Sequence, residues 1–218
     1  MEVLLVAHTP DPERVVARSA RVCYSFSPPQ EISIEEARRL IKELIFRGHH
    51  SVLEHVSFTF LIKGLSRVTS HQLVRHRIAS YSQQSQRYTD LTKASFVTPP
   101  LINENPKAAE VFQEVVKTTL EAYNKLVELG VPREDARFVL PQAVKTNLVF
   151  TANARELRHF FSLRLCNRAQ WEIRELAFQM LKIVREIASS IFEEVGPPCL
   201  RGTCPEGERG CGHPWKKN

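Results

Sequence analysis

Apolar and polar residues follow two different periods along the chain, and these periods separate strands from helices. Residues 2–7 (EVLLVA) and 143–152 (AVKTNLVFTA) are largely apolar runs that predict strands. Residues 56–62 alternate between apolar and polar side chains with the two-residue period of a strand, and Gly64 is expected to end it.

Capping signals bound the segments with a helical period. Asp11 and Pro12 are expected to begin a first helix, and Ser33 with Glu36 forms a capping box for a second helix that stops at Gly48. This leaves His49, His50 and Ser51 in a loop. Further helices are expected over a short segment from about residue 66 to Arg75, over 105–130, over a turn at 132–141, after a capping pair at Asn153 and Glu156, and over 169–194.

A few strands combined with long helices, without strict alternation, predict an α+β fold with a mixed or antiparallel sheet flanked by long helices. A chain of 218 residues is long enough for one sizeable core, so we expect a single domain over residues 1–195. The composition changes only in residues 196–218, a tail that contains Cys199, Cys204, Cys211 and His213.

The charge balance favours anionic partners. Thirty Lys and Arg residues against twenty-four Asp and Glu give a formal net charge of +6, which suits a nucleic acid, a nucleotide or a phosphorylated cofactor equally well. No apolar stretch reaches the length of a membrane span, and five cysteines without a secretory signal indicate reduced thiols. We therefore expect a cytoplasmic protein without a membrane partner.

The segment RHRIASYSQQSQRY, residues 75–88, concentrates cationic side chains, hydroxyls and amides. No acidic residue occurs between His55 and Thr89, a composition that suits anion oxygens, which need several donors at once. Neighbouring side chains on a helix point about 100° apart. Arg75, His76 and Arg77 must therefore lie at a helix end or serve different sites, and an interface between subunits would use all three.

Three other interpretations concern this segment or the tail. His76 and Ser85 could belong to a Ser–His hydrolase, but the segment has no acidic residue and the chain has no GxSxG elbow. A basic RNA- or DNA-binding protein is the alternative that stays open, although Tyr81 and Tyr88 give only sparse aromatic interleaving. The tail cysteines lack the close CxxC pairs of structural zinc, so no metal ligands are assigned.

A second polar cluster lies downstream and contains Arg137, Asn153, Arg155, His159 and Arg164. Arg155 and His159 are four residues apart and share a helix face. The two clusters together predict a large polyanionic ligand. Cys166 lies between Arg164 and Arg168, which would favour a thiolate, but a small buried thiol is the more common situation.

The segment RHRIASYSQQSQRY closely resembles the signature of the flavin-dependent thymidylate synthases: RHR, seven residues, a serine, and an arginine two positions later. Similar blocks occur along most of the chain: GHHSVLEH at 48–55, ARFVLP at 136–141, TANARELRHFFSLR at 151–164 and AQWEIRELA at 169–177. The resemblance implies an intertwined homotetramer with FAD at subunit interfaces. It also implies the synthesis of dTMP from dUMP, with methylenetetrahydrofolate as carbon donor and NADPH as reductant.

The resemblance also implies roles for individual residues. The positions that match FAD contacts are Ser51, Arg75, His76, Arg77, Gln83, Asn153, Ala154, Arg155 and His159. The positions that match dUMP contacts are Gln72, Arg75, Gln83, Gln84, Ser85, Gln86, Arg87, Arg137 and Arg164. His49 and Tyr88 match positions where the folate stacks near the flavin, and Arg164 matches the residue that polarises the uracil.

A fixed guanidinium beside the uracil ring would stabilise the negative charge that activation develops, and reduced flavin would supply the hydride, so no cysteine nucleophile is needed. The chain departs from the common pattern at three positions. Many relatives have Asn in place of Ser82 and an acidic residue in place of Gln83, and some have Asn in place of His159. The change at Gln83 puts in doubt any role that requires a carboxylate there.

Overall fold

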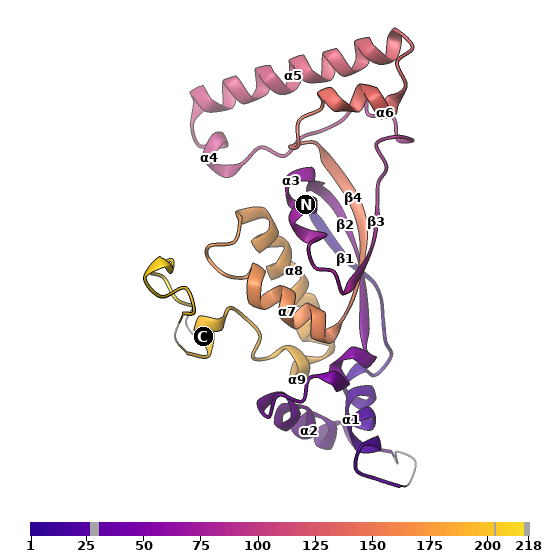
Figure 1. Ribbon diagram of the computed structural model, residues 1–218, viewed down its shortest axis with the longest axis vertical. Helices are drawn as coiled ribbons and strands as arrows, with labels where there is room; N and C mark the ends of the chain where they lie inside the picture. Colours follow the sequence, from indigo (N-terminus) through magenta and orange to yellow (C-terminus); the bar gives the residue numbers. More distant parts are fainter. Residues whose placement is uncertain (27–30, 203, 216–218) are drawn as a thin grey trace. The chain divides into compact units, whose positions relative to one another are not determined.

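The computed structural model describes residues 1–26, 31–202 and 204–215 and has an α+β fold (Figure 1). The strands are β1 (Glu2–His8), β2 (Ser57–Ser66), β3 (Ala79–Gln83) and β4 (Lys145–Asn153). The α-helices are α1 (Pro12–Val22), α2 (Ile34–Phe46), α3 (Arg67–Leu73), α4 (Pro100–Asn103), α5 (Pro106–Glu128), α6 (Arg133–Ala136), α7 (Ala154–Arg164), α8 (Trp171–Ile187) and α9 (Ser189–Phe192). Short 3-10 helices are η1 (Ser51–His55), η2 (Arg137–Val139), η3 (Pro198–Leu200) and η4 (Gly207–Arg209).

The strands form one antiparallel sheet in the order β1-β2-β4-β3. The bonds at the strand ends show the antiparallel direction, because Thr9 N donates to Ser57 O (3.0 Å) and Gln84 N donates to Asn147 O (2.8 Å). The prediction of an α+β fold with long helices is therefore confirmed, and the sheet is antiparallel rather than mixed. None of the helices in the described part of the chain is both long and apolar enough to span a membrane.

The described residues divide into two compact units. Unit 1 contains residues 1–2, 62–75 and 82–148, and unit 2 contains residues 3–61, 76–81 and 149–218 apart from those that are not described. All four strands contribute residues to both units. One boundary between the units falls inside the RHR sequence, between Arg75 and His76.

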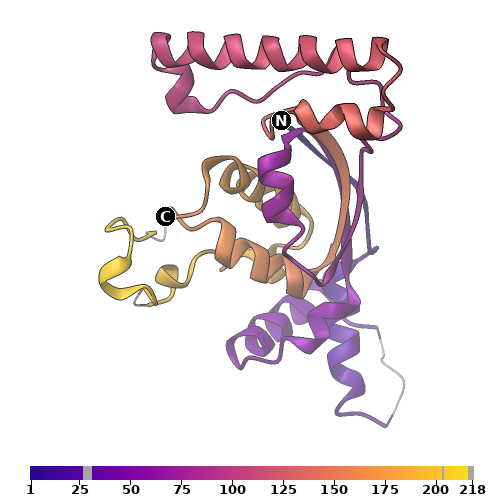
Figure 2. The ribbon, with the colours of Figure 1, turned by 45° about the horizontal axis from the view of Figure 1, so that its top comes forward.

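Unit 1 contains the long helix α5, which lies beside α4 and α6 (Figures 1 and 2). The side chain of Asn105 accepts a hydrogen bond from Ala108 N and caps α5, as predicted, and Pro106 occupies the first turn. Tyr123 of α5 is buried against Leu91 and Ala136. Much of the apolar side of α5 is nevertheless exposed, because Val111 is 61% and Val115 is 51% accessible.

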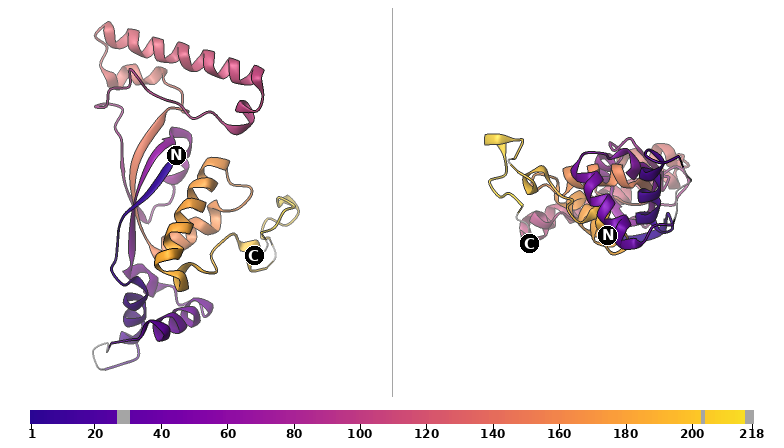
Figure 3. Two further views of the ribbon diagram at one scale, coloured as in Figure 1. Left: turned by 180° about the vertical axis from the view of Figure 1, so that it is seen from behind. Right: turned by 90° about the horizontal axis from the view of Figure 1, so that it is seen from below.

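Unit 2 has an aromatic core beneath α7 and α9. Phe58 of β2 contacts Phe192 of α9 edge to face, with ring centroids 5.6 Å apart, and Phe150 of β4 lies 6.1 Å from Phe160 of α7. The helices α7 and α8 pack side by side (Figure 3), and α1 packs on α2. Burial of these rings fixes the position of α7, the helix that carries most of the downstream polar cluster.

Local signals placed most element boundaries correctly. Ser33 caps α2 by accepting a hydrogen bond from Glu36 N (3.2 Å), and Gly48 follows that helix with φ +80°. Asp11 precedes α1 but its side chain makes no capping bond. The expected loop at His49, His50 and Ser51 is shorter than predicted because Ser51 begins η1.

Two predictions of element extent are wrong, and one strand was not predicted. Gly64 does not end β2, because it adopts φ +72° within the strand and its N donates to the Asn147 side chain (2.9 Å). The last long helix is divided, since Ala188 has φ −142° and ψ 63° between α8 and α9. The strand β3 was not predicted, because its sequence ASYSQ is largely polar.

Candidate functional site

Helix α7 organises the polar cluster of unit 2. The Asn153 side chain accepts a hydrogen bond from Glu156 N (2.9 Å) and begins the helix. Glu156, Phe160 and Arg164 follow at intervals of four residues and therefore share one face. The His76 ring contacts Phe160 on this face edge to face, with centroids 4.9 Å apart.

His76 links the two ends of this face. Its Nδ1 lies 3.1 Å from Glu156 Oε1, and its Nε2 accepts a hydrogen bond of 3.0 Å from Arg164 Nε. His76 and Glu156 are buried, with 4% and 6% of their surfaces exposed. The hydroxyl of Tyr81 also donates to the His76 carbonyl oxygen (2.7 Å).

The electrostatics of this cluster keep His76 neutral. Burial lowers the pKa of His76 to about 4, and the positive charges of Arg164 and His159 act in the same direction. Burial also raises the pKa of the Glu156 carboxyl, although the charge of His159 opposes that increase. The contact between His76 and Glu156 is therefore a hydrogen bond between a neutral imidazole and the carboxyl, and not an ion pair, near neutral pH.

The other predicted flavin contacts of unit 2 lie mostly on its surface. Ser51, Arg77, Arg155 and His159 are exposed, and His49, a predicted folate position, is exposed as well. Arg155 pairs with Glu54. Arg77 forms no ion pair with a carboxylate of the described residues, so its charge is available to an anionic ligand.

Most of the predicted nucleotide contacts lie in unit 1, on β3 and the segment after it. Gln83 Nε2 donates to Thr146 Oγ1 (3.3 Å) and Gln84 Oε1 accepts from Asn147 N (3.2 Å), so both amides are held against β4. The Ser85 hydroxyl oxygen accepts a hydrogen bond from Arg87 N (3.2 Å). The same unit contains Gln72 and Arg75 at the end of α3, Gln86, Tyr88, and Arg137 at the start of η2.

One acidic residue joins two of the predicted nucleotide contacts. Arg87 Nε donates to Glu134 Oε2 (2.7 Å), and Arg137 Nε donates to the Glu134 backbone oxygen (3.0 Å). The Arg87 guanidinium also lies 5.5 Å from the centroid of the Tyr88 ring. The residues of RHRIASYSQQSQRY thus acquire an acidic neighbour from α6, 47 positions away.

Arg67 is a cationic residue of unit 1 that the sequence analysis did not assign to the site. Its guanidinium donates to Gln84 O (3.1 Å), but its Nε is buried without a hydrogen-bond partner in the described part of the chain. Burial lowers the pKa of Arg67, and the charge of Arg137 adds to this effect. The signals in the sequence that could have indicated this are its place in the segment without acidic residues between His55 and Thr89 and its position eight residues before Arg75.

Glu156 is the second residue that was missed, because its pattern indicated only a capping pair. The backbone N of Glu156 does join the cap, while its carboxylate contacts a ring 80 positions away in sequence. Separation of this kind leaves no local pattern, and only the fold reveals it.

The C-terminal tail forms one wall of a pocket of about 390 Å³ in unit 2. Arg164, Cys166 and Arg168 line it from α7 and the turn after it, and Cys199, Cys204 and Glu206 line it from the tail. Arg168 fixes the tail by donating to Glu206 Oε2 (2.7 Å) and Arg209 O (2.8 Å). The five cysteines are free thiols, and within the described ranges no three metal-binding side chains converge.

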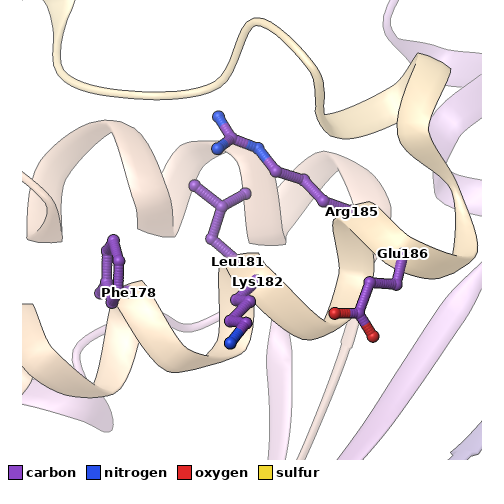
Figure 4. Close-up of a pocket in the computed structure, with 5 residues that line it drawn as sticks. All are labelled: Phe178, Leu181, Lys182, Arg185 and Glu186. Atoms are coloured by element: carbon purple, nitrogen blue, oxygen red, sulfur yellow. The ribbon is translucent and has the colours of Figure 1, made fainter. Parts of the chain in front are cut away.

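A second hollow, of about 330 Å³, lies on α8 and contains none of the predicted site residues. Figure 4 shows its lining, Phe178, Leu181, Lys182, Arg185 and Glu186, which all come from this helix. Arg185 donates to Phe192 O (3.0 Å) and so joins α8 to α9.

Comparison with known proteins identifies the family. Residues 4–189 match the family described as thymidylate synthase complementing protein (Thy1), which is most of the chain. The chain belongs to this family. Among curated Thy1 relatives, the flavin-dependent thymidylate synthase of Geobacter sulfurreducens is 51% identical, with 97% of this chain and 94% of the relative aligned.

Relatives of the same name occur in distant organisms. The flavin-dependent thymidylate synthases of Clostridium tetani and Pyrococcus furiosus are each 44% identical to this chain and cover 97% and 94% of it. The resemblance that the RHRIASYSQQSQRY segment indicated is therefore confirmed at the level of the Thy1 family. The individual contacts to ligands stay predictions.

Proposed function

We propose that the protein is a flavin-dependent thymidylate synthase that methylates dUMP to dTMP. In this reaction methylenetetrahydrofolate donates the carbon, and NADPH reduces the flavin. The observation that carries the proposal is membership in the Thy1 family over residues 4–189, together with the names of relatives that align with nearly the whole chain.

The polar surface of unit 2 fits a flavin dinucleotide. The pyrophosphate of FAD needs cationic and hydrogen-bonding groups. Unit 2 offers the guanidinium of Arg77, which pairs with no carboxylate of the described residues, and the exposed side chains of Ser51 and His159. The residues that would hold FAD are Ser51, His76, Arg77, Asn153, Ala154, Arg155 and His159 of unit 2, with Arg75 and Gln83 of unit 1. When bound, FAD supplies the hydride that completes the methyl group.

The residues of this surface differ in what their side chains can offer to FAD. The ring nitrogens of His76 are both occupied by Glu156 and Arg164, and the residue is buried. Its ring is therefore better suited to holding Arg164 than to donating a proton to a ligand. Asn153 uses its oxygen in the cap of α7, so its amide nitrogen is the group that would face the cofactor.

The cations of unit 1 support a site for the nucleotide phosphate. Arg67 and Arg137 lie close enough for the charge of one to affect the other, and the Arg67 Nε is buried without a partner. A phosphate would relieve this repulsion and supply the missing acceptor. We therefore add Arg67 to the proposed dUMP contacts. The other proposed contacts are Gln72, Arg75, Gln83, Gln84, Ser85, Gln86, Arg87, Arg137 and Arg164.

Arg164 is the proposed catalytic residue. Activation of the uracil ring at C5 places negative charge on the ring, and a guanidinium that is held in position stabilises that charge. The bond from Arg164 Nε to His76 restricts the guanidinium, which is the kind of preorganisation that this role requires. His49 and Tyr88 are exposed and would stack with the folate.

We also propose that the active form is an intertwined homotetramer in the cytoplasm, with FAD at subunit interfaces. Exposed apolar side chains in unit 1 support an assembly, because large contiguous apolar surfaces are uncommon on monomers. They include Leu101, Val111, Val115, Leu129 and Phe138, each at least 51% accessible. In this proposal residues 1–195 form the catalytic domain and residues 196–218 form a tail outside it.

The proposal is tested by measuring dTMP formation with dUMP, methylenetetrahydrofolate, FAD and NADPH, omitting each component in turn. We expect product only in the complete mixture and a yellow purified protein that contains flavin. The alternative from the sequence, a basic nucleic-acid-binding protein, predicts a colourless protein that FAD does not reconstitute and that retains RNA or DNA. That second outcome would refute the proposed function.

A further inference from the structure

A buried chain of side chains ends at the proposed catalytic arginine. Glu156 and Arg164 lie on one face of α7, and the His76 ring bridges them at 3.1 Å and 3.0 Å. The bridge is enclosed by Phe160 on one side and by Tyr81, whose hydroxyl donates to the His76 carbonyl. Neither the resemblance nor the comparisons assign a role to Glu156.

The donor at Arg164 determines which His76 nitrogen holds the proton. A guanidinium can only donate, so the His76 Nε2 that receives its bond must carry a lone pair. The neutral ring then has its proton on Nδ1, where it donates to Glu156 Oε1. Glu156 thus stabilises the one tautomer of His76 that can accept a hydrogen bond from Arg164.

We propose that Glu156 is a positioning residue, which holds the guanidinium of Arg164 in place by fixing the tautomer of His76. The inference rests on the proposed role of Arg164 beside the uracil ring. Without an acceptor at Nδ1, the ring is free to carry its proton on Nε2, where it would oppose the Arg164 donor. A misplaced catalytic group costs rate even when the group itself is present.

The helix cap and the positioning role are separable. Asn153 caps α7 through the backbone N of Glu156, so replacement of the Glu156 side chain leaves that bond intact. Glu156→Gln retains an oxygen that can accept from Nδ1, whereas Glu156→Leu removes the acceptor and keeps a side chain of similar size. The exposed Glu175 of α8 provides the matched control, Glu175→Leu.

The first measurement is the tautomer of His76 in the full-length, flavin-loaded protein labelled with ¹⁵N-histidine. Nitrogen chemical shifts distinguish a protonated from an unprotonated ring nitrogen. We expect the proton on Nδ1 in the wild type, Glu156→Gln and Glu175→Leu, and on Nε2 in Glu156→Leu. A structural role for Glu156 alone would not move the proton between the nitrogens.

The second measurement is turnover at saturating dUMP. We expect Glu156→Leu to lose roughly 10- to 100-fold, a penalty of the size seen when a catalytic group is misplaced by about 1 Å. Glu156→Gln should recover most of the rate. If Glu156→Leu does not fold, Glu156→Asp replaces it as the test variant, because its side chain is one methylene shorter and moves the acceptor away from Nδ1. The rate of Glu156→Asp should fall between those of Glu156→Gln and Arg164→Ala.

The outcomes separate this inference from the proposed function. Wild-type turnover in Arg164→Ala would remove the catalytic role of Arg164, on which the inference rests. The positioning role alone would be overturned if Arg164→Ala is impaired while a folded Glu156→Leu, or Glu156→Asp, keeps the Nδ1 proton and the wild-type rate. A rate loss in Glu156→Leu with the proton still on Nδ1 would also overturn it.

Discussion

Glu134 neutralises one of the cations that we expect to bind the phosphate of dUMP. Its Oε2 accepts a hydrogen bond of 2.7 Å from Arg87, and both side chains are about half exposed, at 51% for Arg87 and 47% for Glu134. A phosphate that binds Arg87 must displace this carboxylate or share the guanidinium with it. Replacement by Gln removes the charge and keeps the backbone oxygen that accepts from Arg137.

The exposure of the pair limits the size of the effect. Solvent-exposed ion pairs contribute about 0.2–1 kcal/mol, because water screens the charges and both side chains lose freedom. If dUMP no longer has to compete with Glu134, its Kd should fall by a factor of about 1.4 to 5. The gain should shrink at higher ionic strength, since salt already screens the carboxylate from the phosphate.

Titration of dUMP into the flavin-loaded protein, followed by calorimetry at low and high salt, measures this change. Glu121→Gln is the matched control, because Glu121 belongs to an exposed pair with Lys117 on α5, outside the proposed site. A weaker affinity in Glu134→Gln would mean that Glu134 orients Arg87 for the ligand and does not compete with it. Unchanged affinities in both Glu134→Gln and Arg87→Ala would remove Arg87 from the nucleotide site.

Three further predictions concern unit 2. Arg164→Ala should lower turnover by about 10²-fold or more, as expected for one lost electrostatic stabiliser, and near-normal dTMP formation would refute its role. Burial alone would raise the pKa of the Glu13 carboxyl, but hydrogen bonds from Arg38 and Ser190 outweigh it and lower the pKa. Glu13→Gln should therefore melt below the wild type at neutral pH. That difference should begin to shrink as the pH falls below the usual 4.5, where the unfolded chain takes up the proton, and should vanish only below the lowered pKa of the folded protein, where Glu13 is protonated in both states. A pH-independent difference would contradict this. Arg168→Ala should release the tail and speed the reaction of Cys199 and Cys204 with a thiol reagent, whereas equal reactivity would show that the tail is held by other contacts.

Local sequence signals predicted the elements that depend on local chemistry. The caps at Ser33, Asn105 and Asn153 were found because each side chain bonds to a backbone N three residues later. The strand β3 was missed because a polar sequence such as ASYSQ gives no hydrophobic alternation, and its pairing with β4 compensates for that. The continuation of β2 past Gly64 was also missed. The backbone N of Gly64 donates to the side chain of Asn147 on β4, a contact that no local pattern around Gly64 reveals.

The candidate site could be predicted as a set of cations but not as a set of pairs. The residues of RHRIASYSQQSQRY and TANARELRHFFSLR were identified by their resemblance to one family, and the roles of the individual residues stay predictions. What the sequence could not provide is the carboxylate that contacts Arg87, Arg155 or the neutral His76, because Glu134, Glu54 and Glu156 lie 47, 101 and 80 positions from these side chains.

The position of Glu156 also bears on the interpretation of His76 and Ser85 as part of a Ser–His hydrolase. That interpretation was disfavoured because no acidic residue lies near His76 in sequence, yet the fold does bring a carboxylate to its Nδ1. A carboxylate and a histidine are two members of a nucleophilic triad, so the lack of an acidic residue near His76 in sequence does not by itself exclude a hydrolase. The decisive observation is at the other nitrogen. Because Nε2 accepts a hydrogen bond from Arg164, it has no free lone pair with which to deprotonate a hydroxyl. The pair of Glu156 and His76 therefore holds Arg164 and does not activate a serine.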